Sequence, residues 1–229
     1  MSKLIPTEKD KTGRFCYAYD KNNKFPSKKK PLIRGVLNRP VGLLLYRRII
    51  RRDQELGRAA LRAWNDWHLE EWVGAAPDRF IPLQLVWVND PVIAAADIRA
   101  NAERGCKAVS FPENPVDLGL PPMIDPHWDP LLAACEETGT VICLHNGSSA
   151  WSAARSPGAP LELYTSLFPV NALVTAADWL WAKVPTRFPD IRIAFSEGGI
   201  SWVPMLIDRI TYVLDHSAVG AHGWDDPHV

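Results

Sequence analysis

The chain has 229 residues, of which 47% are hydrophobic and 23% are charged, and its formal net charge at pH 7 is zero. This length and composition are typical of one globular domain with a sizeable buried core. The balanced charge excludes a protein that is basic or acidic throughout. No apolar run reaches the length of about eighteen residues that a membrane-spanning helix needs, so no membrane is expected as a partner.

The charge is unevenly distributed along the chain. Residues 1–52 hold 15 Lys and Arg against 3 Asp and Glu, whereas residues 53–229 hold 11 against 23. We therefore expect a basic, partly disordered N-terminal segment at 1–52 and a folded domain at 53–229. Basic segments can bind nucleic acid or anionic lipid, and the leucines and arginines of residues 31–52 could form an amphipathic helix. A solvated arm is the preferred interpretation, so nucleic acid is not an expected partner.

The chain has four cysteines, none in a C-x-x-C pair, and their placement indicates the cellular compartment. Three of them lie inside elements predicted to be part of the core, and isolated buried thiols are typical of a reducing environment. The first residues lack the apolar run of a secretory signal. The expected localisation is cytoplasmic. The cysteines are Cys16, Cys106, Cys135 and Cys143.

The folded part begins with a helix and continues as an alternation of strands and helices. Residues 53–73 carry apolar side chains at spacings of three and four, which predicts a helix that ends before Gly74 and Pro77. Strands are expected at residues 79–89, 106–111, 140–144 and 191–195. Further helices are expected at residues 90–105, 129–139 and 174–184, and from residue 201 onward.

Two Asp-Pro pairs, at Asp90 and Asp129, predict where the first two of these later helices begin, each Asp serving as a cap. A long loop is expected after the third strand, because Pro157, Pro160 and Pro169 interrupt it.

Four consecutive strand–helix units imply parallel strands with helices packed outside them. An open doubly wound sheet and part of a (β/α)8 barrel both fit this pattern. No strand is followed by a glycine-rich nucleotide-binding loop, so nucleotide binding has little support. In either architecture the chemistry gathers at the carboxyl ends of the strands.

The residues that follow the strands include an imidazole and carboxylates. His145 ends the third predicted strand, Glu197 follows the fourth, and Glu113 and Asn114 follow the second. An imidazole and a carboxylate on one rim suit metal ligation or general acid–base catalysis. The alternatives are structural, since a histidine after an apolar strand is often simply hydrogen-bonded, Glu197 could cap the next helix and Asn114 could serve a turn.

Several motifs in order resemble the amidohydrolase-related family, the branch of the amidohydrolase superfamily that includes aminocarboxymuconate-semialdehyde decarboxylase-like enzymes. The similarity covers residues 55–229. It is carried by N-D-W-H-L-E-E-W, P-D-R-F-I-P-L, G-C-K-A-V-S-F-P-E-N-P, D-P-H-W-D-P-L-L-A-A-C-E-E-T-G-T-V-I-C-L-H-N-G-S-S and I-A-F-S-E-G-G-I-S-W-V-P-M-L-I-D-R.

The resemblance implies a metal-dependent (β/α)8 barrel in which a divalent metal, usually zinc, activates water or polarises the substrate. His145 matches the family's fifth-strand metal ligand. Glu197 stands at the sixth-strand position, where decarboxylase relatives carry a catalytic histidine, and is the candidate catalytic residue.

On this mapping the four strands are family strands three to six. Residues 1–60 contain no H-x-H pair, and the sequence ends shortly after the sixth-strand helix, before the place of any eighth-strand Asp. The expected fold is therefore a partial (β/α)8 TIM barrel of class α/β, shortened at both ends. An arc of four strands leaves open edges, which favour a homo-oligomer.

The expected function is that of a metal-dependent hydrolase or carboxy-lyase acting on a small polar organic substrate. Zinc is the first choice of metal. The alternative is a catalytically inactive half-barrel that acts as an oligomerisation or binding module. The candidate substrate-binding residues are Asn114, Asn146, Ser148 and Trp202.

Overall fold

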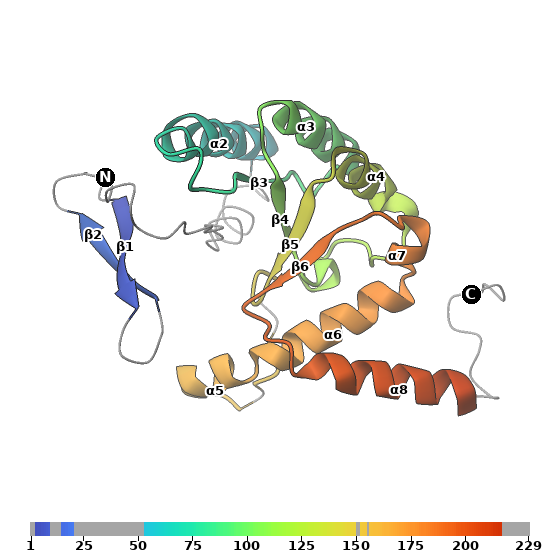
Figure 1. Cartoon of the computed structure of the whole chain (residues 1–229). Helices are drawn as coiled ribbons and strands as arrows, with labels where there is room; N and C mark the ends of the chain where they lie inside the picture. The colour runs from blue at the N-terminus through green and yellow to red at the C-terminus, as the bar shows by residue number, and fades with distance from the viewer. Residues whose placement is uncertain (1–2, 10–14, 21–52, 150–151, 155, 217–229) are drawn as a thin grey trace.

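The computed structural model of the chain describes a two-stranded hairpin and a four-stranded parallel sheet flanked by helices (Figure 1). From residue 53 onward it also describes the side chains. The described residues are 3–9, 15–20, 53–149, 152–154 and 156–216.

The hairpin joins β1, Lys3–Lys9, to β2, Phe15–Asp20, in antiparallel order, with a register shift between Pro6 and Glu8. Both strands lie within residues 1–52, the part of the chain predicted to be a basic, partly disordered segment. The aromatic and hydrophobic run of β2, F-C-Y-A-Y, has the strand propensity that accounts for the pairing. The amphipathic helix predicted at residues 31–52 lies outside the described residues.

The predicted helix at 53–73 is present, but it changes type along its length. The α-helix α2, Gln54–Trp67, is capped by Asp53, whose carboxylate accepts a hydrogen bond of 2.9 Å from the backbone N–H of Leu56. It continues as the π-helix η2, His68–Val73. Gly74 follows the last residue of this helix, and a side chain would not fit there, because a Cβ at this position would lie 2.0 Å from the carbonyl oxygen of Glu70.

All four strands of the second sheet are parallel and stand in chain order, which confirms the predicted α/β class with a parallel sheet. The first strand is much shorter than the predicted 79–89, since only three of its residues pair with the next strand. The strands are β3, Leu83–Leu85; β4, Ala108–Pro112; β5, Val141–His145; and β6, Ile193–Ser196.

Helices follow each strand, as the alternation predicts. They are α3, Pro91–Glu103; η3, Pro115–Leu118; η4, Pro126–Trp128; α4, Asp129–Thr138; α5, Leu161–Ser166; α6, Phe168–Trp181; α7, Val184–Arg187; and α8, Trp202–His216. Among the described helices, none is both long enough and apolar enough to cross a bilayer.

Two details of the helix starts differ from the predictions. The helix predicted at 174–184 begins six residues earlier, at Phe168, and Pro169 lies in its first turn. A proline there costs little, because the first N–H groups of a helix have no partner within it. Asp90 caps α3 as expected, whereas Asp129 is the first residue of α4 and binds Arg187 instead of capping the helix.

The main core lies between one face of the sheet and the helices. Alternate residues of β4 and β5 point into it, and at its centre Phe111 meets Trp128 and Trp179 edge-on, with ring centroids 5.1 and 5.8 Å apart. The other face of the sheet carries smaller side chains, among them Ala108 and Cys143. Replacing an aromatic residue of this core by alanine costs about 3–5 kcal/mol, so these three rings contribute strongly to the stability of the fold.

Candidate active site at the carboxyl end of the sheet

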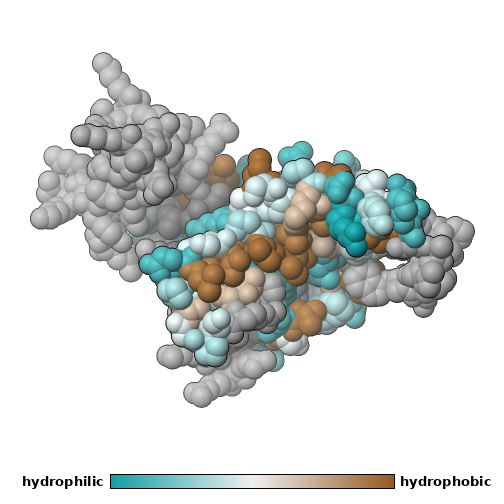
Figure 2. Space-filling model, turned by 90° about the horizontal axis from the view of Figure 1, so that it is seen from below, coloured by the Kyte–Doolittle hydropathy of each residue, from teal (hydrophilic) through white to brown (hydrophobic). Residues whose placement is uncertain are grey.

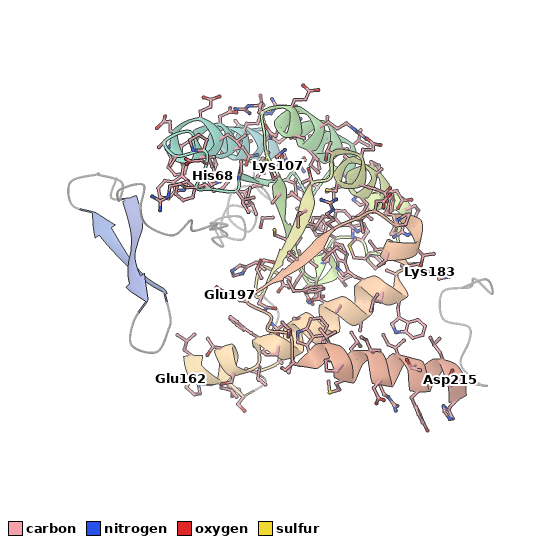
Figure 3. All side chains as sticks on the ribbon, viewed as in Figure 1. His68, Lys107, Glu162, Lys183, Glu197 and Asp215 are labelled. Carbon is pink, nitrogen blue, oxygen red and sulfur yellow. The ribbon has the colours of Figure 1, made fainter. Side chains whose placement is uncertain are left out.

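Three strands bring the candidate residues to one edge. In the sheet register Pro112 of β4 lies beside His145 of β5, which lies beside Ser196 of β6. The residues one position further, Glu113, Asn146 and Glu197, therefore follow the same edge. Figure 3 shows Glu197 at the end of the sheet opposite to Lys107, which precedes β4.

His145 and Glu197 face each other at this edge. The imidazole Nε2 lies 3.6 Å from Oε2 of Glu197, and the two side chains are 16% and 59% exposed. This distance is slightly too long for a direct hydrogen bond. The imidazole is therefore mostly buried, the carboxylate is exposed to solvent, and the two can share a third group between them.

The backbone fixes which nitrogen of His145 carries the proton. Its Nδ1 lies 2.9 Å from the carbonyl oxygen of Asn146. A carbonyl oxygen can only accept a hydrogen bond, so Nδ1 must be the donor. In the neutral imidazole Nε2 then carries the free lone pair, and it points toward Glu197.

The turn that carries Glu197 has an unusual backbone. Glu197 has φ of 64°, in the left-handed region that non-glycine residues rarely adopt, and Gly199 two residues on has φ of 60°. Such a conformation costs about 1–3 kcal/mol and persists only where the surroundings impose it. The strained turn places a carboxylate beside the imidazole.

Glu113 follows β4 and is therefore expected on the rim with His145 and Glu197, but its side chain lies elsewhere. Its side chain is only 1% exposed and turns into the protein, where it binds the loop after β5. Oε1 accepts from the N–H of Gly147 at 2.8 Å, and Oε2 accepts from the N–H of Ser149 at 3.1 Å and from the hydroxyl of Ser148.

The four candidate substrate-binding residues lie around this edge and differ in their hydrogen bonds. The Nδ2 of Asn146 is buried without a hydrogen-bond partner. Oδ1 of Asn114 accepts from the hydroxyl of Thr175 at 3.3 Å. The Ser148 hydroxyl is held by Glu113, and the indole N–H of Trp202 donates to the carbonyl of Gly198 at 2.9 Å.

The fit to a metal ion is partial. Two ligands bound at about 2.1 Å in tetrahedral geometry lie about 3.4 Å apart, close to the 3.6 Å between His145 Nε2 and Glu197 Oε2. Catalytic zinc sites take three protein ligands, and the part of the chain that the structure describes holds no cluster of three metal-binding side chains. Burial raises the pKa of the Cys143 thiol to about 11, so this thiol is protonated in the metal-free protein. The described residues thus supply two donors and do not complete a site.

The family model of the amidohydrolases matches residues 45–228. The chain therefore belongs to the amidohydrolase family, as its sequence motifs indicate. Among curated proteins, none matches the chain.

Solved structures share the fold. An amidohydrolase from Mycobacterium avium subsp. paratuberculosis K-10 is 27% identical, with a TM-score of 0.56 over 72% of this chain and 45% of its own. The 5-carboxyvanillate decarboxylase of Sphingomonas paucimobilis is 21% identical, with a TM-score of 0.54 over 72% of this chain and 50% of its own. That of Novosphingobium aromaticivorans DSM 12444, complexed with manganese and 4-hydroxy-3-methoxy-5-nitrobenzoic acid, is 19% identical, with a TM-score of 0.54 over 73% and 48%. The chain spans about half the length of these proteins.

Proposed function

We propose that residues 53–229 form family strands three to six of a (β/α)8 barrel and belong to a metal-dependent hydrolase or carboxy-lyase that acts on a small polar substrate. The observation that carries the proposal is the pairing of His145 and Glu197 at the carboxyl end of a parallel sheet. In barrels of this kind the active site lies at that end.

His145 would bind the metal through Nε2, and Glu197 would serve as a second ligand or as the proton acceptor. The remaining donors must come from outside the described residues. Imidazole nitrogen suits zinc, and carboxylate oxygen suits manganese, the metal found with the Novosphingobium relative. Zinc is our first choice because the donor that the backbone orients best is the imidazole.

A carboxylated aromatic compound is the substrate class that the relatives favour. Solved relatives include decarboxylases of 5-carboxyvanillate and of 2,6-dihydroxybenzoate. We propose that Asn114 and Asn146 supply polar contacts to such a molecule, while Ser148 and Trp202 stabilise the walls of the site through their hydrogen bonds to Glu113 and Gly198. Glu197 would take up or deliver the proton that either reaction requires.

Metal binding tests this proposal without knowledge of the substrate. The purified chain would be dialysed against zinc or manganese and its metal content measured. His145→Ala should weaken binding by at least ~10-fold, the loss of about 1.4 kcal/mol. His216→Ala is the matched control, because His216 is exposed on α8 and its Nδ1 bonds the carbonyl of Tyr212 in its own helix. Metal binding that His145→Ala leaves unchanged would refute the proposed metal site.

A second candidate is an inactive half-barrel that pairs with a second copy of the chain. Within the described residues β3 and β6 have no neighbour on their outer edges. Helix α8 also exposes apolar side chains, and Figure 2 shows apolar surface on the face where it lies. Exposed strand edges and apolar patches favour association. The exposed apolar residues of α8 and the turn before it are Ile200, Val203, Met205, Ile207, Tyr212 and Leu214.

Sedimentation tests whether the chain forms such a dimer. A dimer that dissociates in Ile207→Glu but persists in the neighbouring control Asp208→Asn would support association through α8. A monomer at high micromolar concentration would exclude it.

We also propose a cytoplasmic location. Three free cysteines are buried in the core, which suits a reducing compartment. Oxidised cysteines in the protein isolated from cells without exposure to oxidants would contradict this assignment.

A further inference from the structure

One peptide group links a buried carboxylate to the imidazole of the candidate site. The carbonyl of Asn146 accepts from Nδ1 of His145 at 2.9 Å. The N–H of the same peptide belongs to Gly147 and donates to Oε1 of Glu113 at 2.8 Å. Because a peptide group is planar and conjugated, withdrawal of the N–H toward a carboxylate increases the negative charge on the carbonyl oxygen.

We propose that Glu113 is a positioning residue that acts on His145 through the Asn146–Gly147 peptide. The carboxylate strengthens the carbonyl as an acceptor, and the carbonyl holds the proton on Nδ1. The lone pair of Nε2 is thereby kept at the rim, facing Glu197. Metal-binding histidines commonly donate their second ring N–H to a carboxylate or a carbonyl, which orients the ring. Here the carbonyl would orient His145, and the carboxylate of Glu113 would act on that carbonyl.

The surroundings keep the Glu113 carboxylate in place. It is almost completely buried, and its second oxygen accepts from the N–H of Ser149 at 3.1 Å and from the hydroxyl of Ser148. Its own carbonyl accepts from the indole N–H of Trp179, a core residue of α6, at 3.3 Å. Hydrogen bonds to an ionised group are about twice as strong as neutral ones, and burial strengthens them further.

A purely structural role would also explain these contacts, since Glu113 ties β4 to the loop after β5. The two roles differ in what they predict for His145. A structural tie affects the stability of the loop, whereas positioning also determines which imidazole nitrogen carries the proton. The tautomer of His145 therefore separates them.

The test is a long-range nitrogen–proton NMR spectrum of the full chain with ¹⁵N-labelled histidine, recorded at a pH at which the ¹⁵N shifts themselves show a neutral ring. The wild-type chain should show His145 protonated on Nδ1. In Glu113→Gln the ratio of the Nδ1–H to the Nε2–H form should fall by at least ~5-fold, because a charge-assisted contact is lost. Glu136→Gln is the matched control, since Glu136 also accepts a backbone N–H across the fold, that of Asp190 at 2.9 Å, but on α4.

A wild-type spectrum with the proton on Nε2 would overturn the proposal without any variant. An unchanged tautomer in folded Glu113→Gln would do the same. If that variant does not fold, Ser148→Ala replaces it, because it removes a contact to Oε2 and leaves Oε1 on Gly147. The Nδ1–H form should persist in Ser148→Ala, and its loss would count against the relay.

The inference rests on the proposed function only in taking His145 as the imidazole of the site. The NMR experiment needs neither metal nor substrate, so its result is independent of activity. Metal binding that His145→Ala leaves unchanged, together with an intact Nδ1–H tautomer, would refute the proposed function alone.

Discussion

Gly198 allows the turn after β6 to lie directly against α6. A Cβ built on Gly198 would lie 2.6 Å from the Cβ of Ala172, which is 1% exposed on that helix. Carbon atoms in good contact are about 3.5–4.0 Å apart, so Gly198→Ala forces a shift of about 1 Å. Overpacking of this kind costs about 1–3 kcal/mol, offset in part by the ~0.4–1 kcal/mol that alanine gains by restricting the unfolded chain.

We therefore expect Gly198→Ala to destabilise the chain by about 1–2 kcal/mol, or about 2–8 °C in Tm at this chain length. The second variant, Ala172→Gly, removes the opposing Cβ and by itself costs about 1 kcal/mol for a glycine within a helix. In the double variant the clash is absent. The two changes should then couple by about 1–2 kcal/mol in the stabilising direction.

Urea unfolding of the wild type, both single variants and the double variant measures this coupling. The slope of the unfolding free energy with urea should stay the same in all four, because the surface exposed on unfolding barely changes. Strictly additive effects would show that Gly198 and Ala172 do not meet, and the packing of the Glu197 turn against α6 would then be wrong.

Three further predictions concern the rest of the domain. Asn65→Ala should cost about 2–5 kcal/mol in urea unfolding, because it leaves the buried N–H and C=O of Leu85 without their bonds of 2.8 and 2.9 Å; a loss below ~1 kcal/mol would contradict this. Burial lowers the pKa of His68 to about 4 from 6.5, so between these two pH values the unfolded chain binds more protons than the folded chain. The free energy of unfolding should therefore fall as the pH drops from 6.5 to about 4. His68→Phe should make this fall smaller, and an unchanged pH dependence would refute the burial effect on His68. Arg99→Ala should cost less than ~1 kcal/mol, because its ion pair with Glu137 is exposed, and a larger loss would mean a role beyond that pair.

The sequence predicts the order of the elements because their starts are encoded locally. Asp90 followed by proline supplies a cap and a preset backbone angle, and its carboxylate does accept from the N–H groups of Val92 and Ile93. The apolar runs of β4 and β5 predict the burial that most of their residues show, as in other parallel sheets. The motifs of residues 55–229 indicate the family that the family model finds over 45–228.

Element boundaries depend on tertiary contacts that the local sequence does not encode. Residues 86–88 are as apolar as β3 itself and are buried, but they do not pair with β4. Pro169 predicts a loop, yet the same residue is compatible with the first turn of α6, and packing of α6 against the core selects the helix. Asp129 predicts a cap, but the guanidinium of Arg187 competes for its carboxylate.

In the candidate site, too, some features follow from the local sequence and others depend on tertiary contacts. The position of His145 at the end of an apolar strand predicts its place on the rim, and in the sheet register His145 lies beside Ser196, the last residue of β6. The inward turn of Glu113 is not visible in the sequence, because Glu113 and Asn114 both follow β4 and the pattern does not say which one the loop at 147–149 will bind. That orientation depends on hydrogen bonds between segments 34–36 residues apart.

X-ray absorption at the zinc edge of the zinc-loaded chain tests the central claim most directly, because it identifies the atoms bound to the metal. We expect imidazole nitrogen and carboxylate oxygen at about 2.0–2.2 Å, no sulfur at about 2.3 Å, and loss of the imidazole signal in His145→Ala but not in His216→Ala. A sulfur-bound zinc, or a spectrum that His145→Ala leaves unchanged, would contradict the placement of the metal at the carboxyl end of the sheet.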